Sequence, residues 1–232
     1  MVIGKGLLAR AFRGYAADQE IIIFASGVSN SRETDEQAFL RERSLLGSLN
    51  NTKAKLIYFS TTSVLDPSLT QSRYVQHKLQ MESYIENHIE NYVIFRLPNV
   101  VGQSNNPNTF FNSMRSGLEE GEVVIMREAY RRLIDVDDLT TYLPDIISHQ
   151  NRKIIDVGFN NQTSVQELVE LMGDILGAQY VQHLKDGGSS YDIDNACFLS
   201  YLASDCVGLL QDYNYILLKK YLKDNDNILP TQ

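Results

Sequence analysis

Short, mainly apolar runs alternate with longer segments of helical periodicity along most of the chain. The runs stand at 1–3, 21–25, 55–60, 92–97 and 153–158, and each ends at or leads into glycine, proline or hydroxyl-bearing residues. Because the runs show little polar alternation, they predict strands that are buried on both faces. Strands that alternate with helices favour a parallel sheet covered by helices on both sides.

The segments between the runs predict helices over 39–49 and 70–88. In the second segment, four apolar side chains fall within about a third of the helical wheel and predict one buried face. These are Val75, Leu79, Ile85 and Ile89. Asp137 and Asp138 are expected to cap a helix that begins near Leu139, because a carboxylate can accept hydrogen bonds from the first free N–H groups.

The pattern changes after residue 102, where 103–108 form a polar loop. Ser164 and Glu167 then make a capping-box sequence, which opens a helix that we expect to end at Gly177. A last helix is expected near 204–222.

Composition and charge mainly argue against certain classes of function. The chain of 232 residues has a net charge of −8 and no basic block, which argues against nucleic acid or an anionic membrane as its main partner. Cys197 and Cys206 give no metal-binding spacing and no disulfide framework. We interpret His77 and His183 as solvated residues and expect no metal centre. Without a signal-peptide pattern or an apolar run near the ~18 residues of a membrane span, we expect a cytoplasmic protein.

Glycines, hydroxyls and an amide stand at the carboxyl ends of the predicted strands. They are Gly4-Lys5-Gly6, Ser26-Gly27, Ser60-Thr61 and Asn99. In open parallel sheets ligands bind at the carboxyl ends of the strands. We therefore expect these residues to converge on one binding cleft.

Tyr74 and Lys78 are the candidate chemical groups of this cleft. Residues four apart share one face of a helix, so the Lys78 ammonium can lie beside the Tyr74 phenol. Its charge would favour the phenolate and lower the Tyr74 pKa from about 10, which makes a usable general acid or base. A second pair with this spacing, Tyr215 and Lys219, has no hydroxyl cluster before it. We interpret that pair as packing plus a solvated lysine.

Five segments follow one another in an order that spans most of the chain: Gly4-x-Gly6-x-x-Ala9, Ser60-Thr61-x-x-Val64, Tyr74-x-x-x-Lys78, Arg96 to Gly102 and Arg131 to Leu139. In this order they resemble the extended short-chain dehydrogenase/reductase family, which comprises nucleotide-sugar epimerases, dehydratases and reductases. The resemblance implies an α/β fold with a Rossmann-like, doubly wound parallel sheet and a small C-terminal α/β substrate subdomain. It also implies a dinucleotide-binding domain at 1–102 plus about 132–160, and a smaller substrate-binding subdomain at about 103–131 plus 161–232.

The resemblance implies roles for single residues. Thr61 would hydrogen-bond the reacting sugar oxygen, Tyr74 would be the general acid/base, and Lys78 would hold the nicotinamide ribose and depress the Tyr74 pKa. A glycine turn at a helix N-terminus would let the backbone approach the cofactor pyrophosphate. The implied cofactor-binding residues are Gly4, Gly6, Leu7, Ala9, Ala25, Ser26, Gly27, Lys78 and Pro98.

Thr62, Asn99 and Arg131 are the substrate-binding residues that the resemblance implies. Asn99 and Arg131 match positions that grip a nucleotide diphosphate, and a guanidinium suits this group because its donors form a fork. The expected partner is therefore a nucleotide-sugar substrate. The family also implies a homodimer that pairs the helix carrying Tyr74 and Lys78 with its symmetry mate.

The chain departs from the family pattern where adenosine should bind. The strand at 21–25 and the loop after it resemble the family's fourth strand, so the second and third strands would be missing. The acidic residue expected about 20 residues after the glycines is then absent as well. Arg10, Arg13 or Arg32 would suit a 2′-phosphate. We therefore expect NADP or NAD as the cofactor, with NADP slightly favoured.

The resemblance leaves three functions open. The stretch 60–66 looks nearest to dTDP-4-dehydrorhamnose reductases and lacks the acid pair of the 4,6-dehydratases. We therefore expect an NAD(P)-dependent reductase of a nucleotide-linked keto-sugar in polysaccharide or nucleotide-sugar biosynthesis. A nucleotide-sugar 4-epimerase with tightly bound NAD would use the same residues. A non-catalytic dinucleotide-binding protein would account for the shortened fold.

Overall fold

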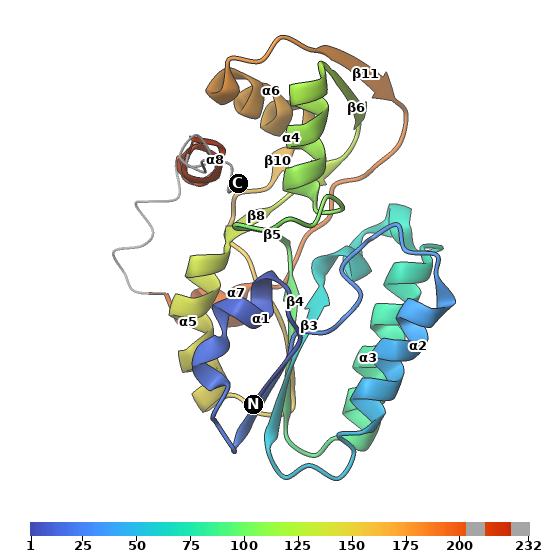
Figure 1. Ribbon diagram of the computed structural model, residues 1–232, viewed down its shortest axis with the longest axis vertical. Helices are drawn as coiled ribbons and strands as arrows, with labels where there is room; N and C mark the ends of the chain where they lie inside the picture. Colours follow the sequence, from blue (N-terminus) through green and yellow to red (C-terminus); the bar gives the residue numbers. More distant parts are fainter. Residues whose placement is uncertain (203–211, 224–232) are drawn as a thin grey trace, which may run out of the picture.

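A five-stranded parallel sheet forms the centre of the computed structural model, which describes residues 1–202 and 212–223 (Figure 1). Its strands are, in spatial order, β1 (Val2–Ile3), β2 (Ile21–Phe24), β3 (Lys55–Thr61), β4 (Tyr92–Leu97) and β9 (Lys153–Asp156). All neighbours in this sheet are parallel. The five apolar runs therefore form the strands that the sequence predicts.

Helices cover both faces of the sheet (Figure 1). One face carries α1 (Leu7–Ala11), α5 (Val136–His149) and α7 (Ala196–Leu199), and the other carries α2 (Glu36–Gly47) and α3 (Arg73–His88). Successive strand residues enter opposite cores, because side chains alternate across a strand. Ile57 packs with the α5 side, whereas Leu56 packs with the α2 and α3 side.

β1 is an edge strand of the sheet, and the fold is shortened on this side. In a doubly wound dinucleotide fold the first strand lies inside the sheet, with the second and third strands beyond it. Within the described residues, β1 pairs only with β2. The chain between them contains α1 and a short 3₁₀ turn, η1 (Arg13–Tyr15). β2 thus takes the place of the fourth strand, and the expected loss of two early strands is confirmed.

A second layer of structure lies beyond the carboxyl ends of the central strands (Figure 1). It contains α4 (Phe110–Glu120), β6 (Glu122–Met126), α6 (Val165–Leu176), β11 (Val181–Lys185) and α8 (Tyr213–Lys223). Two short strand pairs accompany it: β5 (Asn99–Val101) with β8 (Leu133–Asp135), and β7 (Tyr130–Arg131) with β10 (Thr163–Ser164). Of these elements, α4, β5, β6, β8, α6 and α8 share an apolar core of their own. The division of the chain into two domains stays a prediction.

Side-chain caps explain where helices begin and end. α2 begins at Glu36, three residues before the predicted start, because Asp35 accepts a hydrogen bond from the Gln37 amide. α5 begins at Val136 with Asp135 as its cap, so the prediction that Asp137 and Asp138 cap this helix is wrong.

The capping box of α6 is confirmed, since Ser164 and Glu167 bond each other's backbone amides and Gly177 ends the helix at φ +63°. The start of the last predicted helix, near 204, lies outside the described residues, and α8 is described from Tyr213. The sequence pattern did not predict β6, β11 or α7.

α3 buries three of the four side chains of the predicted apolar face, Val75, Ile85 and Ile89, and adds polar side chains to them. It begins at Arg73 because two 3₁₀ turns, η2 (Thr62–Leu65) and η3 (Pro67–Leu69), occupy the preceding residues. Leu79 is 42% exposed, although it belongs to the predicted apolar face. Polar side chains take its place in the interior, namely His77, Lys78 and Glu82.

Polar contacts tie α8 to the start of α5. The Tyr221 hydroxyl donates to Asp135 Oδ1 (2.7 Å), and Lys220 Nζ donates to Asp135 Oδ2 (2.7 Å). Lys220 also donates to Asp137 Oδ2 (2.6 Å). Asp135 therefore caps α5 and holds the last described helix at the same time.

We predict that Asp135→Ala lowers the free energy of unfolding by about 2–4 kcal/mol, because it removes a helix cap and leaves the buried Tyr221 hydroxyl without its acceptor. Urea unfolding measures the loss. Asp137→Ala is the matched control, since the Asp137 side chain is 69% exposed and bonds the same lysine. That change should cost about 1 kcal/mol or less. Equal losses in the two variants would contradict the prediction.

Candidate active site

The end of β3 and the first turns of α3 bring the three predicted catalytic residues together. Thr61 is the last residue of β3, and the face of α3 that carries Tyr74 and Lys78 packs against β3 and η2. The Thr61 side chain interacts with the Tyr74 phenol and lowers its pKa, and Lys78 Nζ lies 6.0 Å from the centre of the Tyr74 ring. All three residues are buried. Their catalytic roles stay a prediction.

The second Tyr–Lys pair lies elsewhere. Tyr215 is 43% exposed on α8, and Lys219 Nζ lies over its ring, 5.3 Å from the centroid. The lysine is exposed as expected, but the interpretation of Tyr215 as a packing residue is wrong. A helix that packs through Leu217 and Leu218 presents Tyr215 to solvent.

Lys78 is held by two partners that sequence reasoning did not find. Its Nζ donates to Glu42 Oε1 (3.0 Å) and to the Tyr58 hydroxyl (3.1 Å). The Lys78 and Glu42 side chains are 3% and 0% exposed, so this is a buried ion pair. One signal could have revealed Glu42: it falls on the buried face of α2 with Phe39 and Leu46, where an apolar residue is expected.

The Glu42 carboxylate has all of its acceptor capacity filled. Oε1 accepts from the Tyr58 hydroxyl (2.6 Å) and Lys78, and Oε2 accepts from the Val28 amide (2.7 Å) and His77 Nε2 (3.0 Å). Burial alone would raise the pKa of Glu42. The Lys78 charge and the hydrogen bonds from His77, Tyr58 and Val28 outweigh it and hold this pKa well below its usual range.

His77 is part of the same cluster, so its interpretation as a solvated residue is wrong. It is 4% exposed, and its ring centre lies 4.7 Å from that of Phe39. Because a carboxylate only accepts, Nε2 carries the proton that bonds Glu42. Nδ1 is buried and has no hydrogen-bond partner among the described residues. This arrangement fits a neutral imidazole. His183, in contrast, is exposed as expected.

Tyr74 is a weaker acid than the sequence predicts. Burial raises its pKa and is the largest influence, while the Lys78 charge and the Thr61 hydrogen bond lower it. The Glu42 charge raises it further. The net shift is upward, so the expectation that Lys78 depresses the Tyr74 pKa below 10 is wrong in its net direction. The phenol is therefore protonated at neutral pH.

The glycine turn lies against the loop that follows β2. Gly4 has φ +131°, and a Cβ at this position would lie 2.2 Å from the Ala25 carbonyl oxygen. Only glycine therefore fits there. Gly6 caps α1, and a Cβ built on it would meet no atom within 4 Å, which leaves open space above the turn. Ala9 is buried. Leu7 packs against Gly102.

The loop after β2 rests on the buried ion pair. A Cβ on Gly27 would lie 2.6 Å from Lys78 Nζ and 2.9 Å from Glu42 Oε1, so the backbone approaches these charges directly. Ser26 O accepts a hydrogen bond from Arg41 Nη2 (3.2 Å). Pro98, at the end of β4, lies beside Gly158. The structure thus groups Gly4, Ala25, Ser26, Gly27 and Lys78, while their binding of a cofactor stays a prediction.

The predicted substrate residues lie beyond the strand ends. Asn99 Nδ2 donates to the Arg132 carbonyl (3.3 Å). Arg131 Nη1 lies 3.9 Å from Asp66 Oδ2 and donates to the Tyr130 carbonyl (2.6 Å). Asp66 Oδ2 is buried and accepts no hydrogen bond from the described part of the chain. Arg131 therefore faces a carboxylate, and its role in substrate binding stays a prediction.

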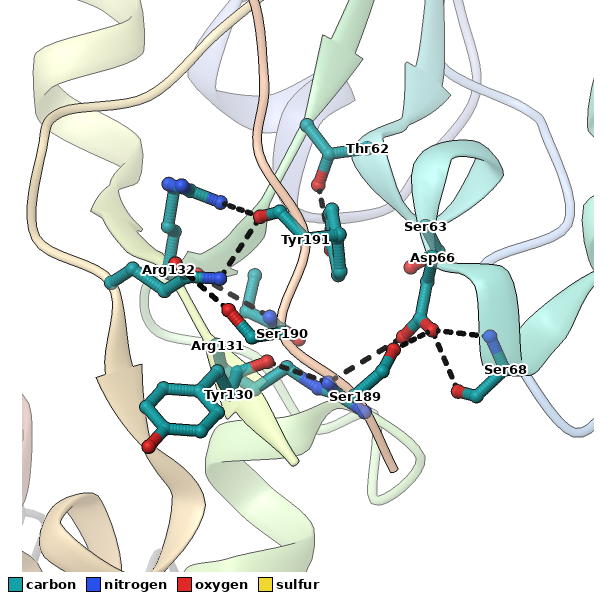
Figure 2. A network of polar contacts seen from close by, with 12 residues as sticks. Thr62, Ser63, Asp66, Ser68, Tyr130, Arg131, Arg132, Ser189, Ser190 and Tyr191 are labelled. Atoms are coloured by element: carbon teal, nitrogen blue, oxygen red, sulfur yellow. Dashed lines mark hydrogen bonds and ion pairs between the residues drawn. The ribbon is translucent and has the colours of Figure 1, made fainter. Parts of the chain in front are cut away.

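Residues 189–191, which follow β11, pass between Thr62 and Asp66 on one side and Arg132 on the other (Figure 2). The Ser189 hydroxyl donates to Asp66, and the Tyr191 hydroxyl lies 3.2 Å from Thr62 Oγ1. Arg132 Nη1 donates to the Tyr191 carbonyl (2.9 Å). Sequence reasoning missed this segment, because nothing in its composition separates it from an ordinary polar loop.

Neither a metal-binding cluster nor a membrane-spanning helix is present among the described residues. Within 1–202 and 212–223, no group of three or more His, Cys, Asp or Glu side chains is placed to hold a metal ion. Among the described helices, none combines the length and apolar character needed to cross a membrane.

Solved structures with this architecture include two 4-epimerases of UDP sugars. The UDP-N-acetylglucosamine 4-epimerase from Methanobrevibacter ruminantium M1, in complex with UDP-N-acetylmuramic acid, is 18% identical, with a TM-score of 0.65 over 95% of this chain and 81% of that chain. RMD from Pseudomonas aeruginosa, complexed with NADPH, is 14% identical, with a TM-score of 0.68 over 96% and 98%. The UDP-glucose 4-epimerase of Thermus thermophilus, in complex with NAD, is 12% identical, with a TM-score of 0.68 over 96% and 82%. At these identities the likeness shows the fold.

The family is shown by the sequence itself. A comparison with curated protein sequences finds no match. The model of the NAD dependent epimerase/dehydratase family, however, matches residues 4–158, which is more than half of the chain. This range contains the glycine turn, the Thr61–Tyr74–Lys78 group and the strands β2 to β9. The chain belongs to the NAD dependent epimerase/dehydratase family, and it is an enzyme of the extended short-chain dehydrogenase/reductase type.

Proposed function

We propose that the protein is an NAD(P)-dependent reductase that acts on the keto group of a nucleotide-linked sugar. The observation that carries the proposal is the buried Tyr74 phenol, whose raised pKa keeps it protonated near neutral pH. A protonated phenol can give its proton to a carbonyl oxygen, as ketone reduction requires. Oxidation of a hydroxyl group, with which an epimerase begins, needs the phenolate instead.

The residues at the nicotinamide end fit a dinucleotide cofactor. The close approach at Gly4 and the open space at Gly6 suit a pyrophosphate near the backbone. Lys78 has three N–H donors, of which Glu42 and Tyr58 take two, so one remains for a ribose hydroxyl. The nicotinamide supplies the hydride when it is bound.

Fewer residues fit the cofactor at the end of the site where its adenosine half would bind. The sheet ends at β1 in the described chain, so no neighbouring strand is there to carry an acidic residue for the adenosine ribose. Arg10, which would suit a 2′-phosphate, donates to the carbonyls of Gln103 (2.8 Å) and Lys5 (3.4 Å). NADP and NAD both remain part of the proposal.

The chain's own residues position the sugar and move one proton. Thr61 would hold the carbonyl oxygen through its hydroxyl, next to the Tyr74 phenol whose pKa it already lowers. The Tyr74 hydroxyl would donate its proton to that oxygen as the carbonyl becomes an alcohol. Because both residues are buried, the proton transfer would take place away from bulk water.

The proposed substrate is a nucleotide sugar. Arg131 and Arg132 both lie next to the 189–191 segment, Arg131 towards Asp66 and Arg132 at the Tyr191 carbonyl (Figure 2), and guanidinium groups suit a diphosphate. The complex of the Methanobrevibacter epimerase with a UDP sugar supports this substrate class. Arg131 would have to exchange Asp66 for phosphate on binding. A homodimer through α3, and a cytoplasmic role in polysaccharide or nucleotide-sugar biosynthesis, belong to the same proposal.

A nucleotide-sugar 4-epimerase is the second candidate. Its support is that the similar structures include 4-epimerases, among them those from Methanobrevibacter ruminantium and Thermus thermophilus. Such an enzyme oxidises and reduces the sugar in one binding event, so it needs NAD that stays bound. Membership of an enzyme family disfavours the third possibility, a non-catalytic binding protein.

We predict that Tyr74→Phe lowers turnover of a nucleotide-linked keto-sugar by about 10²-fold or more, because the proton donor is lost. Calorimetry should show that the variant still binds NADPH. Tyr215→Phe is the matched control, since it removes the same hydroxyl from the exposed second pair. That control should retain full turnover. Near-full activity of Tyr74→Phe would refute the mechanism.

The two catalytic candidates differ in how they use the cofactor. For the reductase we predict that purified protein carries little nicotinamide and consumes one NADPH or NADH for each alcohol formed. Absorbance of the reduced nicotinamide, followed together with product by chromatography, measures the ratio. Bound NAD after purification, with product formed and no net consumption of NADPH, would favour the epimerase instead.

A further inference from the structure

Glu42 is the one charged residue of α2 that is fully buried, and stability does not account for it. It falls between Phe39 and Leu46 on the interior face, and it is 0% exposed. Replacing a buried ion pair with well-packed apolar side chains is often neutral or even stabilising. A carboxylate at this position therefore points to a role in the chemistry beside it.

Glu42 fixes Lys78 between itself and Tyr74. Lys78 Nζ bonds Glu42 Oε1 at 3.0 Å and lies 6.0 Å from the centre of the Tyr74 ring. The Tyr58 hydroxyl closes the arrangement, since it donates to Glu42 (2.6 Å) and accepts from Lys78 (3.1 Å). The ammonium charge that acts on Tyr74 is thus always accompanied by the opposite charge of Glu42.

Other titratable groups that the structure describes around this pair carry no uncompensated charge. By element, the groups that face Tyr74 and Lys78 are Glu42 of α2, Tyr58 of β3, and His77 and Glu82 of α3. The geometry of His77 fits a neutral ring. Glu82 is paired with Arg96 of β4 (2.6 Å). Glu42 therefore decides whether Lys78 acts on Tyr74 as a net positive charge.

Glu42 also fixes the backbone on the cofactor side. Its Oε2 accepts from the Val28 amide at 2.7 Å, directly after the glycine whose missing Cβ leaves room for the ion pair. The loop after β2 and the Lys78 ammonium are thereby held by one carboxylate. A substitution of Glu42 would therefore affect both the loop after β2 and the position of Lys78.

We propose that Glu42 is a positioning residue that neutralises Lys78 and so keeps Tyr74 a proton donor. The inference rests on the proposed function, in which Tyr74 protonates a carbonyl oxygen. An uncompensated ammonium beside Tyr74 would favour the phenolate, the form that suits oxidation of an alcohol. With Glu42 in place the two charges oppose each other, and burial keeps the phenol protonated.

Titration of Tyr74 by NMR tests this inference without any substrate. The protein is labelled with ¹³C at the tyrosine ζ-carbon, and the Tyr74 signal is assigned by its loss in Tyr74→Phe. In Glu42→Gln the carboxylate charge is gone, so we expect Tyr74 to titrate about one to three pH units lower than in the unmodified protein. In Glu42→Gln/Lys78→Met both charges are gone, and the titration should return towards its original position. An unchanged titration in Glu42→Gln would overturn the proposal.

Two further variants guard against a purely structural effect. Tyr58→Phe removes a hydroxyl from the cluster without changing its charge, so Tyr74 should shift by about half a unit or less. If Glu42→Gln does not fold, as judged by circular dichroism, the titration of Tyr74 in Lys78→Met alone tests the proposal. It leaves Glu42 uncompensated, and Tyr74 must then titrate higher for the proposal to stand. Absence of turnover in the unmodified protein would refute the reductase and leave this titration valid.

Discussion

A buried ion pair between Glu42 of α2 and Lys78 of α3 is the interaction on which the rest of the site depends. It joins two helices to β3 through Tyr58 and to the loop after β2 through Val28. An unpaired charge in this interior would be costly, so none of these partners can leave without the others losing stability. The pair therefore gives the catalytic end of the fold a fixed geometry.

The shortened sheet leaves most of the candidate binding residues at this end of the fold. With β1 at the edge, the described chain keeps the strand ends that hold Gly4, Gly27 and Thr61, and it lacks the strands that would hold adenosine. Binding of a dinucleotide would then depend mainly on the pyrophosphate turn and on Lys78. A rigid Lys78 matters more in such a protein than in a relative whose sheet continues beyond the first strand.

Local sequence patterns predicted the fold well, because each strand of the sheet is an apolar run and its carboxyl end leads into glycine, proline or hydroxyl-bearing residues. They also placed Thr61, Tyr74 and Lys78 in one cluster. They did not reveal Glu42, because the burial of a charge is decided by partners far apart in the chain. For the same reason the upward shift of the Tyr74 pKa could not be predicted, since it depends on how deeply the phenol is buried.

A crystal structure of the protein with NADPH tests the central claim most directly. We expect the nicotinamide ribose to lie within hydrogen-bonding distance of Lys78 Nζ, with the Glu42–Lys78 contact of 3.0 Å retained. The open space above Gly6 should hold the pyrophosphate. A cofactor bound away from Lys78, or a Lys78 side chain that has left Glu42 to reach it, would contradict the account.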